Sequence, residues 1–216
     1  MSKGDISQVS EIDREAFPAL WPPANYRREL ENRLAHYIVA CDNERVQGPE
    51  IEATPPKGFS GLAFKLGHLF SNDRFYANQL STTGEQYVFG FAGFWIMAGE
   101  AHITNVAVRE KHRRQGMGEL LLISLIDLAT ELDTRLVTLE VRASNTAAQS
   151  LYSKYGFIQV GVRRGYYTDD REDAVLMSLE DITSAPVQAN LQWLKEAHFN
   201  RWGLTAYHAT DTASQH

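Results

Sequence analysis

Apolar positions change their period once between residues 101 and 132, and this change predicts two successive elements. From Ala101 to Val108 the chain has the apolar and β-branched content of a strand. Further along, apolar side chains recur at helical spacing, at Met117, Leu121, Leu125, Leu128 and Leu132. The segment therefore predicts a strand, a short polar loop and a helix.

Similar patterns predict alternating helices and strands over most of the chain. The expected helices cover residues 6–17, 26–35, 146–155 and 186–198. The expected strands cover residues 37–41, 87–97, 101–108, 136–142 and 174–179. Gly99 favours a hairpin turn between the second and third of these strands. Strands that alternate with helices, together with one antiparallel hairpin, predict an α/β fold with a mixed sheet.

The length of the chain and two irregular segments define the expected domain organisation. With 216 residues, 44% of them hydrophobic, the chain is long enough for one well-buried core. We expect a single domain over residues 1–183 and a C-terminal extension over residues 184–216, in which a short helix precedes a frayed tail. Residues 42–86 contain prolines and glycines and are far longer than an ordinary connection between strands. We interpret them as an insertion, either a surface plug or a substrate-binding lid.

Composition and charge narrow the classes of function. A formal net charge of −6 argues against a sequence-independent nucleic-acid binder and leaves room for basic protein substrates. No apolar run approaches the roughly 18 residues of a membrane-spanning helix, and the polar N-terminus does not resemble an export signal. Cys41 is the only cysteine and lies in a strand-like run, which favours a small buried side chain over a nucleophile. One cysteine cannot form an internal disulfide, so the reducing cytoplasm is the expected location.

The loop between the strand at 101–108 and the next helix has the features of an anion site. It reads Arg113-Arg114-Gln115-Gly116-Met117-Gly118, and Arg109 and Lys111 add positive charge. Glycines let the backbone approach a ligand, and the first N–H groups of a helix lack partners within it, which suits a phosphate. The loop matches neither the Gly-x-x-x-x-Gly-Lys-Ser/Thr nor the Gly-x-Gly-x-x-Gly nucleotide motif. On physical grounds it is either a ligand site or a solvated basic connection.

A family resemblance separates these two alternatives. Arg113-x-x-Gly116-x-Gly118 between a strand and a helix resembles the signature of the GNAT family of N-acetyltransferases. The similarity continues in further stretches, which are Leu139–Asn145, Leu151–Tyr152, Tyr155–Phe157, Arg163–Tyr167 and Glu172–Ala174. This set resembles the RimI-type enzymes of the family, which acetylate the N-terminal amine of a ribosomal protein. The resemblance covers about residues 87–179 and implies the GNAT fold, a mixed and mostly antiparallel sheet flanked by helices, with acetyl-CoA as co-substrate.

The resemblance also implies which residues contact the coenzyme. Loop amides hold the pyrophosphate in the family, which implies a cradle of Arg113, Arg114, Gln115, Gly116, Met117, Gly118 and Glu119. Backbone groups of a splayed strand hold the acetyl carbonyl and the pantetheine, which implies Val106, Ala107 and Val108. An asparagine at the position of Asn145 contacts the coenzyme as well, and Asn145 also fits the N-cap of the following helix. No metal is expected, because neither His102 nor His112 has a second histidine or cysteine at metal-ligand spacing.

Glu140 is the candidate general base. Acetyl transfer to an amine requires that the amine lose a proton, and a carboxylate can accept it. Strand alternation places Glu140 on one face with Leu136, Thr138 and Arg142, where a carboxylate is unusual. From spacing alone, an ion pair with Arg142 explains Glu140 as well as a catalytic role does. The resemblance favours the base, since RimI-type enzymes use a glutamate at the matching position.

Tyr152 is the candidate general acid. A phenol with a pKa of about 10 is protonated at neutral pH and can donate to a thiolate whose parent thiol has a pKa of about 8.5. An aromatic side chain at this helical spacing is also typical of a core position. The resemblance favours catalysis, because the family places its general acid at the matching tyrosine.

Tyr166 and Tyr167 are the candidate substrate-binding residues. They resemble the tyrosine pair that lines the peptide-binding side in protein N-terminal acetyltransferases, although two adjacent rings in a loop also suit simple packing. Gly165 and Thr168 flank the pair where RimI-type sequences often carry Asn and Pro, so the peptide pocket can differ. We therefore expect an N-α-acetyltransferase for a protein N-terminus. The alternatives are an acetyltransferase for a small amine or lysine, and a non-catalytic acyl-CoA-binding or interaction module.

Overall fold

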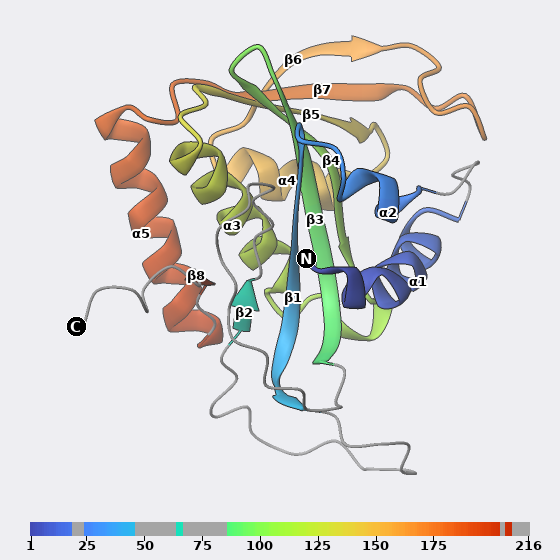
Figure 1. Cartoon of the computed structure of the whole chain (residues 1–216). Helices are drawn as coiled ribbons and strands as arrows, with labels where there is room; N and C mark the ends of the chain where they lie inside the picture. The colour runs from blue at the N-terminus through green and yellow to red at the C-terminus, as the bar shows by residue number, and fades with distance from the viewer. Residues whose placement is uncertain (19–23, 46–63, 67–85, 204–205, 209–216) are drawn as a thin grey trace.

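A six-stranded sheet forms the centre of the molecule (Figure 1). The computed structural model describes residues 1–18, 24–45, 64–66, 86–203 and 206–208. The strands lie in the order β1 (Ala35–Arg45), β3 (Gln86–Met97), β4 (Glu100–Val108), β5 (Leu136–Arg142), β7 (Ala174–Leu179) and β6 (Ile158–Arg163). β4 and β5 are parallel, and the other neighbours are antiparallel. The predicted α/β fold with a mixed, mostly antiparallel sheet is confirmed.

Helices cover both faces of this sheet (Figure 1). On one face, α1 (Ile6–Ala16) and α2 (Tyr26–Glu29) pack over an apolar cluster that includes Phe91 and Ala107. The other face carries α3 (Met117–Glu131), α4 (Thr146–Lys154) and α5 (Ala185–Trp202) over a larger cluster. Short 3-10 helices, η1 (Lys3–Asp5) and η2 (Glu110–His112), precede α1 and α3. Removing this apolar surface from water contributes about 25 cal/mol per Å² and holds the layers together.

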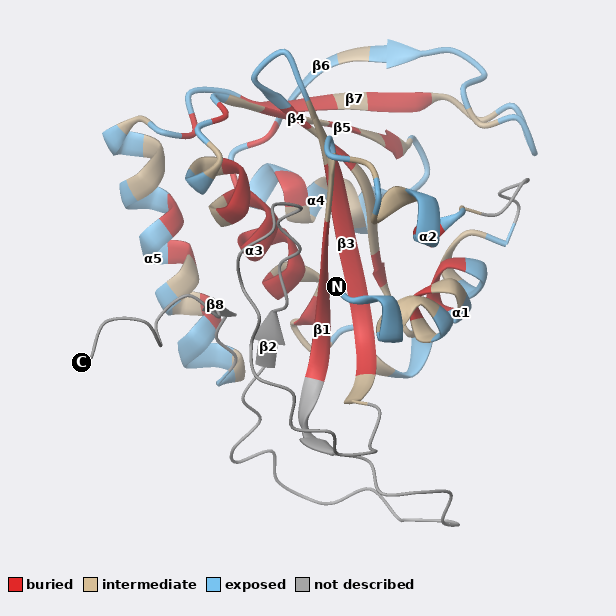
Figure 2. Cartoon of the chain, in the orientation of Figure 1, coloured by how far each residue is buried: buried red, intermediate tan, exposed pale blue. Residues whose placement is uncertain are grey.

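Strand β3, between β1 and β4, is buried on both faces, which explains its nearly continuous apolar sequence (Figure 2). Its neighbours approach closely at Gly90 and Gly93. A Cβ atom at Gly90 would lie 2.6 Å from the Ala107 carbonyl oxygen, and one at Gly93 would lie 2.4 Å from the Tyr37 ring. These two glycines therefore permit the tight packing of β3 between β1 and β4.

Several elements differ from the sequence prediction. β1 covers Ala35–Arg45, where only residues 37–41 were expected to form a strand. The helix expected over residues 26–35 ends at Glu29, because Asn32 accepts a hydrogen bond from the Leu34 N–H (3.1 Å) and turns the chain into β1. Strand β6 was not predicted, and it forms the outer edge beside β7 with several exposed side chains (Figure 2). Helix α5 begins next to Pro186, as expected, but continues past His198 to Trp202.

Two other predictions about single residues are confirmed. Ala98 and Gly99 adopt positive φ angles of 53° and 81° in the turn between β3 and β4, as a hairpin requires. Cys41 is buried in the smaller apolar cluster with 4% of its surface exposed. It therefore occupies the packing position that its sequence context predicts.

The predicted insertion and tail lie mainly outside the described residues. From these regions the structure describes the end of β1, the strand β2 (Phe64–Leu66) and the strand β8 (Ala206–His208). β2 and β8 pair in parallel as a separate two-stranded sheet. In the part of the chain that the structure describes, no helix has the length and apolar character needed to cross a membrane.

Candidate active site

The pairing of the parallel strands β4 and β5 ends midway along β4. Their pairing begins at Glu100 with Leu136 and ends at Ile103 with Leu139, although β4 continues to Val108. A bulge in the β3–β4 pairing lies at the same level, between Gly93 and Phe94. Val106, Ala107 and Val108 thus lie in the stretch of β4 that no longer pairs with β5. On the side that faces away from β3, the backbone groups of this stretch are available to a ligand, apart from the Val108 carbonyl, which accepts a hydrogen bond from Arg113 Nε.

Helix α3 begins beside the end of β4 with an uncapped N-terminus. Gly116 is the N-cap residue, and its left-handed conformation (φ 82°) and missing side chain leave the first turn without a side-chain cap. The N–H groups of residues 117–119 have no acceptor within the helix. Arg113 Nε donates a hydrogen bond to the Val108 carbonyl at 3.2 Å, which fixes the loop to the end of β4. This arrangement favours a bound anion at the helix start.

Glu140 is the first residue of β5 beyond the last pair with β4. Its side chain is 8% exposed and both oxygens have partners. His102 Nε2 lies 2.9 Å from Oε2, and Arg163 Nη1 lies 2.7 Å from Oε1. His102 Nδ1 lies 2.9 Å from the Thr138 hydroxyl, so the imidazole joins Thr138 to Glu140. A nearly buried carboxylate is thereby held in one orientation at the point where the strands separate.

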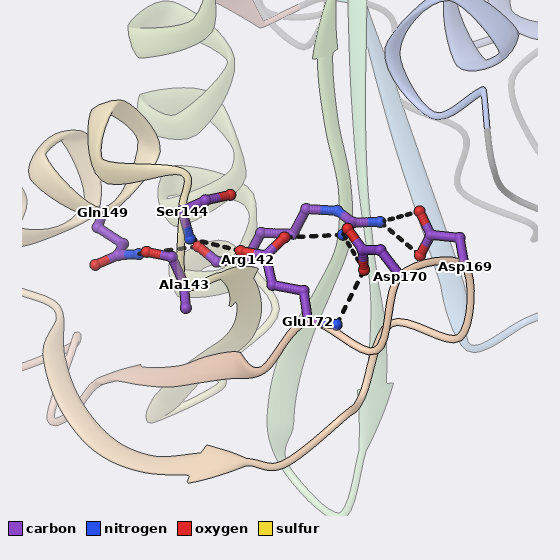
Figure 3. Close-up of polar contacts among 7 residues, drawn as sticks. All are labelled: Arg142, Ala143, Ser144, Gln149, Asp169, Asp170 and Glu172. Atoms are coloured by element: carbon purple, nitrogen blue, oxygen red, sulfur yellow. Dashed lines mark hydrogen bonds and ion pairs between the residues drawn. The ribbon is translucent and has the colours of Figure 1, made fainter.

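Arg142 organises the loop between β6 and β7 (Figure 3). Its guanidinium bonds both oxygens of Asp169 at 2.8 and 2.7 Å, contacts Asp170 at 2.9 Å, and contacts Glu172 at 2.9 Å. The hydrogen bonds from Arg142 lower the pKa of Asp169 and of Glu172. Glu172 also accepts the Ser144 N–H at 2.6 Å, which joins the loop to the start of α4. The ion pair between Arg142 and Glu140 that the spacing allowed is replaced by this carboxylate cluster.

The tyrosine pair, Tyr166 and Tyr167, is held through a contact of Tyr167 with Arg142. The Arg142 guanidinium carbon lies 4.0 Å from the centre of the Tyr167 ring, a cation–π contact. Tyr166 packs edge-on against Tyr167 with ring centres 5.3 Å apart, and it is 42% exposed. Arg163, the partner of Glu140, lies 5.5 Å from the Tyr166 ring. The tyrosine pair is therefore linked to Glu140 through Arg163 and to β5 through Arg142.

Tyr152 is buried on α4, with 9% of its surface exposed. Burial raises the pKa of its phenol to about 12, and the neighbouring Tyr167 adds to the shift. Burial likewise raises the pKa of Tyr167 to about 12, although Arg142 opposes that shift and Glu140 adds to it. Tyr167 thus lies within electrostatic reach of both Tyr152 and Glu140. Tyr152 keeps its proton throughout the neutral pH range.

Comparisons with known proteins agree on one family. Residues 51–157 match the model described as "Acetyltransferase (GNAT) family". The chain is 36% identical over 174 residues, 80% of its own length and 87% of the relative, to a Bacillus subtilis protein named "Putative ribosomal protein bS18-alanine N-acetyltransferase". It is 40% identical over 109 residues, 50% of its length and 72% of the relative, to the ribosomal protein bS18-alanine N-acetyltransferase of Escherichia coli.

A solved structure extends this similarity to the fold. The crystal structure of the ribosomal-protein-S18-alanine N-acetyltransferase from Escherichia coli matches with a TM-score of 0.56 and 27% identity, over 84% of this chain and 90% of that one. The chain belongs to the GNAT family of acetyltransferases. The resemblance stated from the sequence motifs is thereby confirmed, and with it the expectation of an N-acetyltransferase.

The predicted site residues of this GNAT enzyme fall into two groups. Glu140, Tyr152 and the tyrosine pair are joined by the contacts and electrostatic effects described above. The loop residues 113–119 and the free stretch of β4 form the second group around the start of α3. Asn145 caps α4 by accepting the Ala148 N–H at 3.1 Å, as its sequence position predicts.

Two contributors to the site of this GNAT enzyme escaped the sequence patterns. His102 was expected to be an ordinary polar residue of a strand, yet it bonds Glu140. Its register with Thr138, two residues before Glu140, could have revealed the contact if the pairing of β4 with β5 had been known. Arg163 was part of the family motif without an assigned role, and it reaches Glu140 from the unpredicted strand β6. Among the described residues, no three His, Cys, Asp or Glu side chains gather as metal ligands would.

Proposed function

We propose that this GNAT enzyme transfers the acetyl group of acetyl-CoA to the N-terminal amine of a protein, and that a ribosomal protein is the substrate. The observation that carries the proposal is Glu140, a carboxylate fixed by His102 and Arg163 at the point where β4 and β5 separate. The named activities of the relatives support the choice of an α-amine and of a ribosomal protein as acceptor.

The coenzyme binds where β4 and β5 separate, next to the start of α3. The loop of residues 113–119 binds the pyrophosphate, chiefly through the N–H groups of residues 117–119 that have no acceptor within the helix. The partial positive charge of the helix end and the arginines of the loop support this binding. Backbone groups of Val106, Ala107 and Val108 hold the pantetheine and the acetyl carbonyl. Asn145, at the start of α4, contacts the coenzyme in addition to capping its helix.

The chemistry follows a direct transfer. Glu140, acting directly or through a water molecule, takes a proton from the acceptor ammonium, and the neutral amine attacks the thioester carbonyl. The carbon–sulfur bond then breaks, and Tyr152 donates its proton to the departing thiolate. The nitrogen loses its second proton to solvent as the amide forms, and the Tyr152 phenolate regains a proton from solvent. His102 and Arg163 are positioning residues that hold the Glu140 carboxylate. With a pKa of about 12, Tyr152 is protonated at neutral pH and has a proton to donate.

The acceptor enters on the side of Tyr166 and Tyr167. The half-exposed Tyr166 ring and the Tyr167 ring seated on Arg142 form the wall against which the first residues of a peptide pack. An α-amine, with an ordinary pKa near 8, offers more neutral nucleophile at pH 7 than a lysine with a pKa of about 10.4. This difference favours a protein N-terminus over a lysine side chain.

Fragmentation mass spectrometry tests the proposal. The purified chain is incubated with acetyl-CoA and a panel of peptides that copy protein N-termini, including the alanine-initiated N-terminus of ribosomal protein bS18. Each peptide also carries an internal lysine. We expect the acetyl group on the α-amine, with the bS18 peptide among the best substrates. A matched peptide with a blocked α-amine is the control and should remain unmodified.

The other outcomes distinguish the alternatives. Acetylation confined to lysine side chains or to added small amines would replace the α-amine proposal with another acetyltransferase activity. Binding of acetyl-CoA without transfer to any acceptor would indicate a non-catalytic acyl-CoA-binding module.

A further inference from the structure

Helix α5 packs along α3 with its last turn against the start of that helix (Figure 1). Leu191 and Leu194 are buried in the large apolar cluster. Lys195 forms an ion pair with Asp127 of α3. The helix, which we assign to an extension of the catalytic domain, is therefore anchored to α3 before it reaches the coenzyme loop.

A second polar contact joins the last turns of α5 to the first turn of α3. His198, 2% exposed, has Nδ1 3.5 Å from Oε2 of Glu119. Glu119 also pairs with Lys154 and accepts the Tyr155 hydroxyl at 2.7 Å, both from the end of α4. One carboxylate of the first α3 turn thus holds three helices together next to the loop.

Trp202, the final residue of α5, covers Gly116. A Cβ atom built at Gly116 would lie 2.8 Å from both Cδ1 and Cγ of the indole, so the ring rests directly on the glycine backbone. Gly116 has a φ angle of 82°, and Arg114, two residues earlier, has a φ angle of 62°. The indole therefore lies against a loop in which a non-glycine residue, Arg114, occupies the less favoured left-handed region.

We propose that Trp202 is a positioning residue for the coenzyme loop, an inference that rests on the proposed binding of the pyrophosphate there. Its indole is flat and rigid, and the contact of His198 with Glu119 fixes the last turn of α5 against α3. The indole therefore restricts the backbone around Gly116. The N–H groups of the first α3 turn then point toward the phosphates before the coenzyme arrives. Without the indole, the loop has to be ordered on binding, and this cost lowers the affinity.

The test compares two tryptophans of the same helix. Trp202→Leu is measured beside Trp193→Leu, since Trp193 is 64% exposed and serves as the matched control. Isothermal titration of each full 216-residue chain with CoA gives the coenzyme Kd, and steady-state assays with acetyl-CoA and a peptide acceptor separate KM from kcat. We expect Trp202→Leu to raise the Kd and the acetyl-CoA KM about tenfold, with kcat at saturating acetyl-CoA and the peptide KM close to wild type. Trp193→Leu should change none of them.

A third variant protects the test against misfolding. Trp202→Phe retains an aromatic ring and should give an intermediate Kd, so it replaces the leucine variant if the latter fails to fold. An unchanged Kd in the folded Trp202 variants would overturn the inference, and a tighter Kd would show that α5 obstructs the loop. Failure of the wild-type chain to bind CoA would instead contradict the proposed coenzyme site itself.

Discussion

At the scale of single residues, the orientation of Glu140 depends on partners from two other strands. His102 on β4 and Arg163 on β6 each bond one carboxylate oxygen, at 2.9 and 2.7 Å. His102 also reaches the Thr138 hydroxyl, and its side chain is 32% exposed. The imidazole therefore holds the carboxylate that we propose as the general base.

Replacement of this histidine tests that role. His102→Leu should lower kcat about tenfold, equivalent to about 1.4 kcal/mol of transition-state stabilisation, while the coenzyme Kd stays near wild type. Steady-state kinetics and CoA titration provide the two numbers. His36→Leu is a suitable control, because His36 is a partly buried histidine of β1 that packs on Phe94. A His102 variant with wild-type kcat would remove the imidazole from the mechanism.

At the scale of elements, the loop between β6 and β7 owes its shape to one arginine. Arg142→Met removes the partner of Asp169, Asp170 and Glu172 and the cation under the Tyr167 ring. We expect the peptide KM to rise about tenfold with little change in the coenzyme Kd, because the acceptor wall is displaced and the α3 loop is not.

An arginine of the same loop provides the control for this experiment. Arg164 is 87% exposed and its salt bridge is with Asp173, so Arg164→Met should leave both constants unchanged. Equal effects of the two variants on the peptide KM would mean that general loss of positive charge, rather than loop geometry, accounts for the result.

Local sequence patterns predicted individual helices and strands but not the contacts between them. Helical spacing from Met117 predicted α3, which is buried along most of its length. Strand alternation around Glu140 predicted β5, in which every second side chain is buried in the core. The contact of His102 with Glu140 depends on strand pairing, and the reach of Arg163 depends on the antiparallel β6–β7 edge. Such contacts join residues far apart in sequence, so no local period encodes them. The contact of Trp202 with Gly116 is another contact between residues far apart in sequence.

At the scale of the whole molecule, the buried phenol of Tyr152 and the half-buried phenol of Tyr167 make the stability depend on alkaline pH. The pKa values of Tyr152 and Tyr167 are raised to about 12 by burial, above the value of about 10 expected in the unfolded chain. The fold therefore favours the neutral phenols. This stabilisation is complete below pH 10 and is lost as pH rises toward 12, since the unfolded chain releases its protons first.

Urea unfolding at pH 8, 10 and 11 measures this dependence. We expect the free energy of unfolding of the wild-type chain to fall between pH 10 and 11, and to fall less in Tyr152→Phe, which lacks one titrating phenol. Identical pH dependence in the two proteins would contradict the burial effect assigned to Tyr152.

Glu140 lies where β4 and β5 separate, and its substitution tests the central claim of a general base at this point most directly. Glu140→Gln keeps the size of the side chain and removes its ability to accept a proton, and Glu100→Gln, at the exposed start of β4, is the matched control. Single-turnover acetylation of an N-terminal peptide is measured together with the CoA Kd. The account predicts that Glu140→Gln loses about 10²-fold or more in rate with the Kd nearly unchanged, and that Glu100→Gln behaves as wild type. A Glu140→Gln rate equal to wild type, or a large loss of CoA affinity, would contradict it.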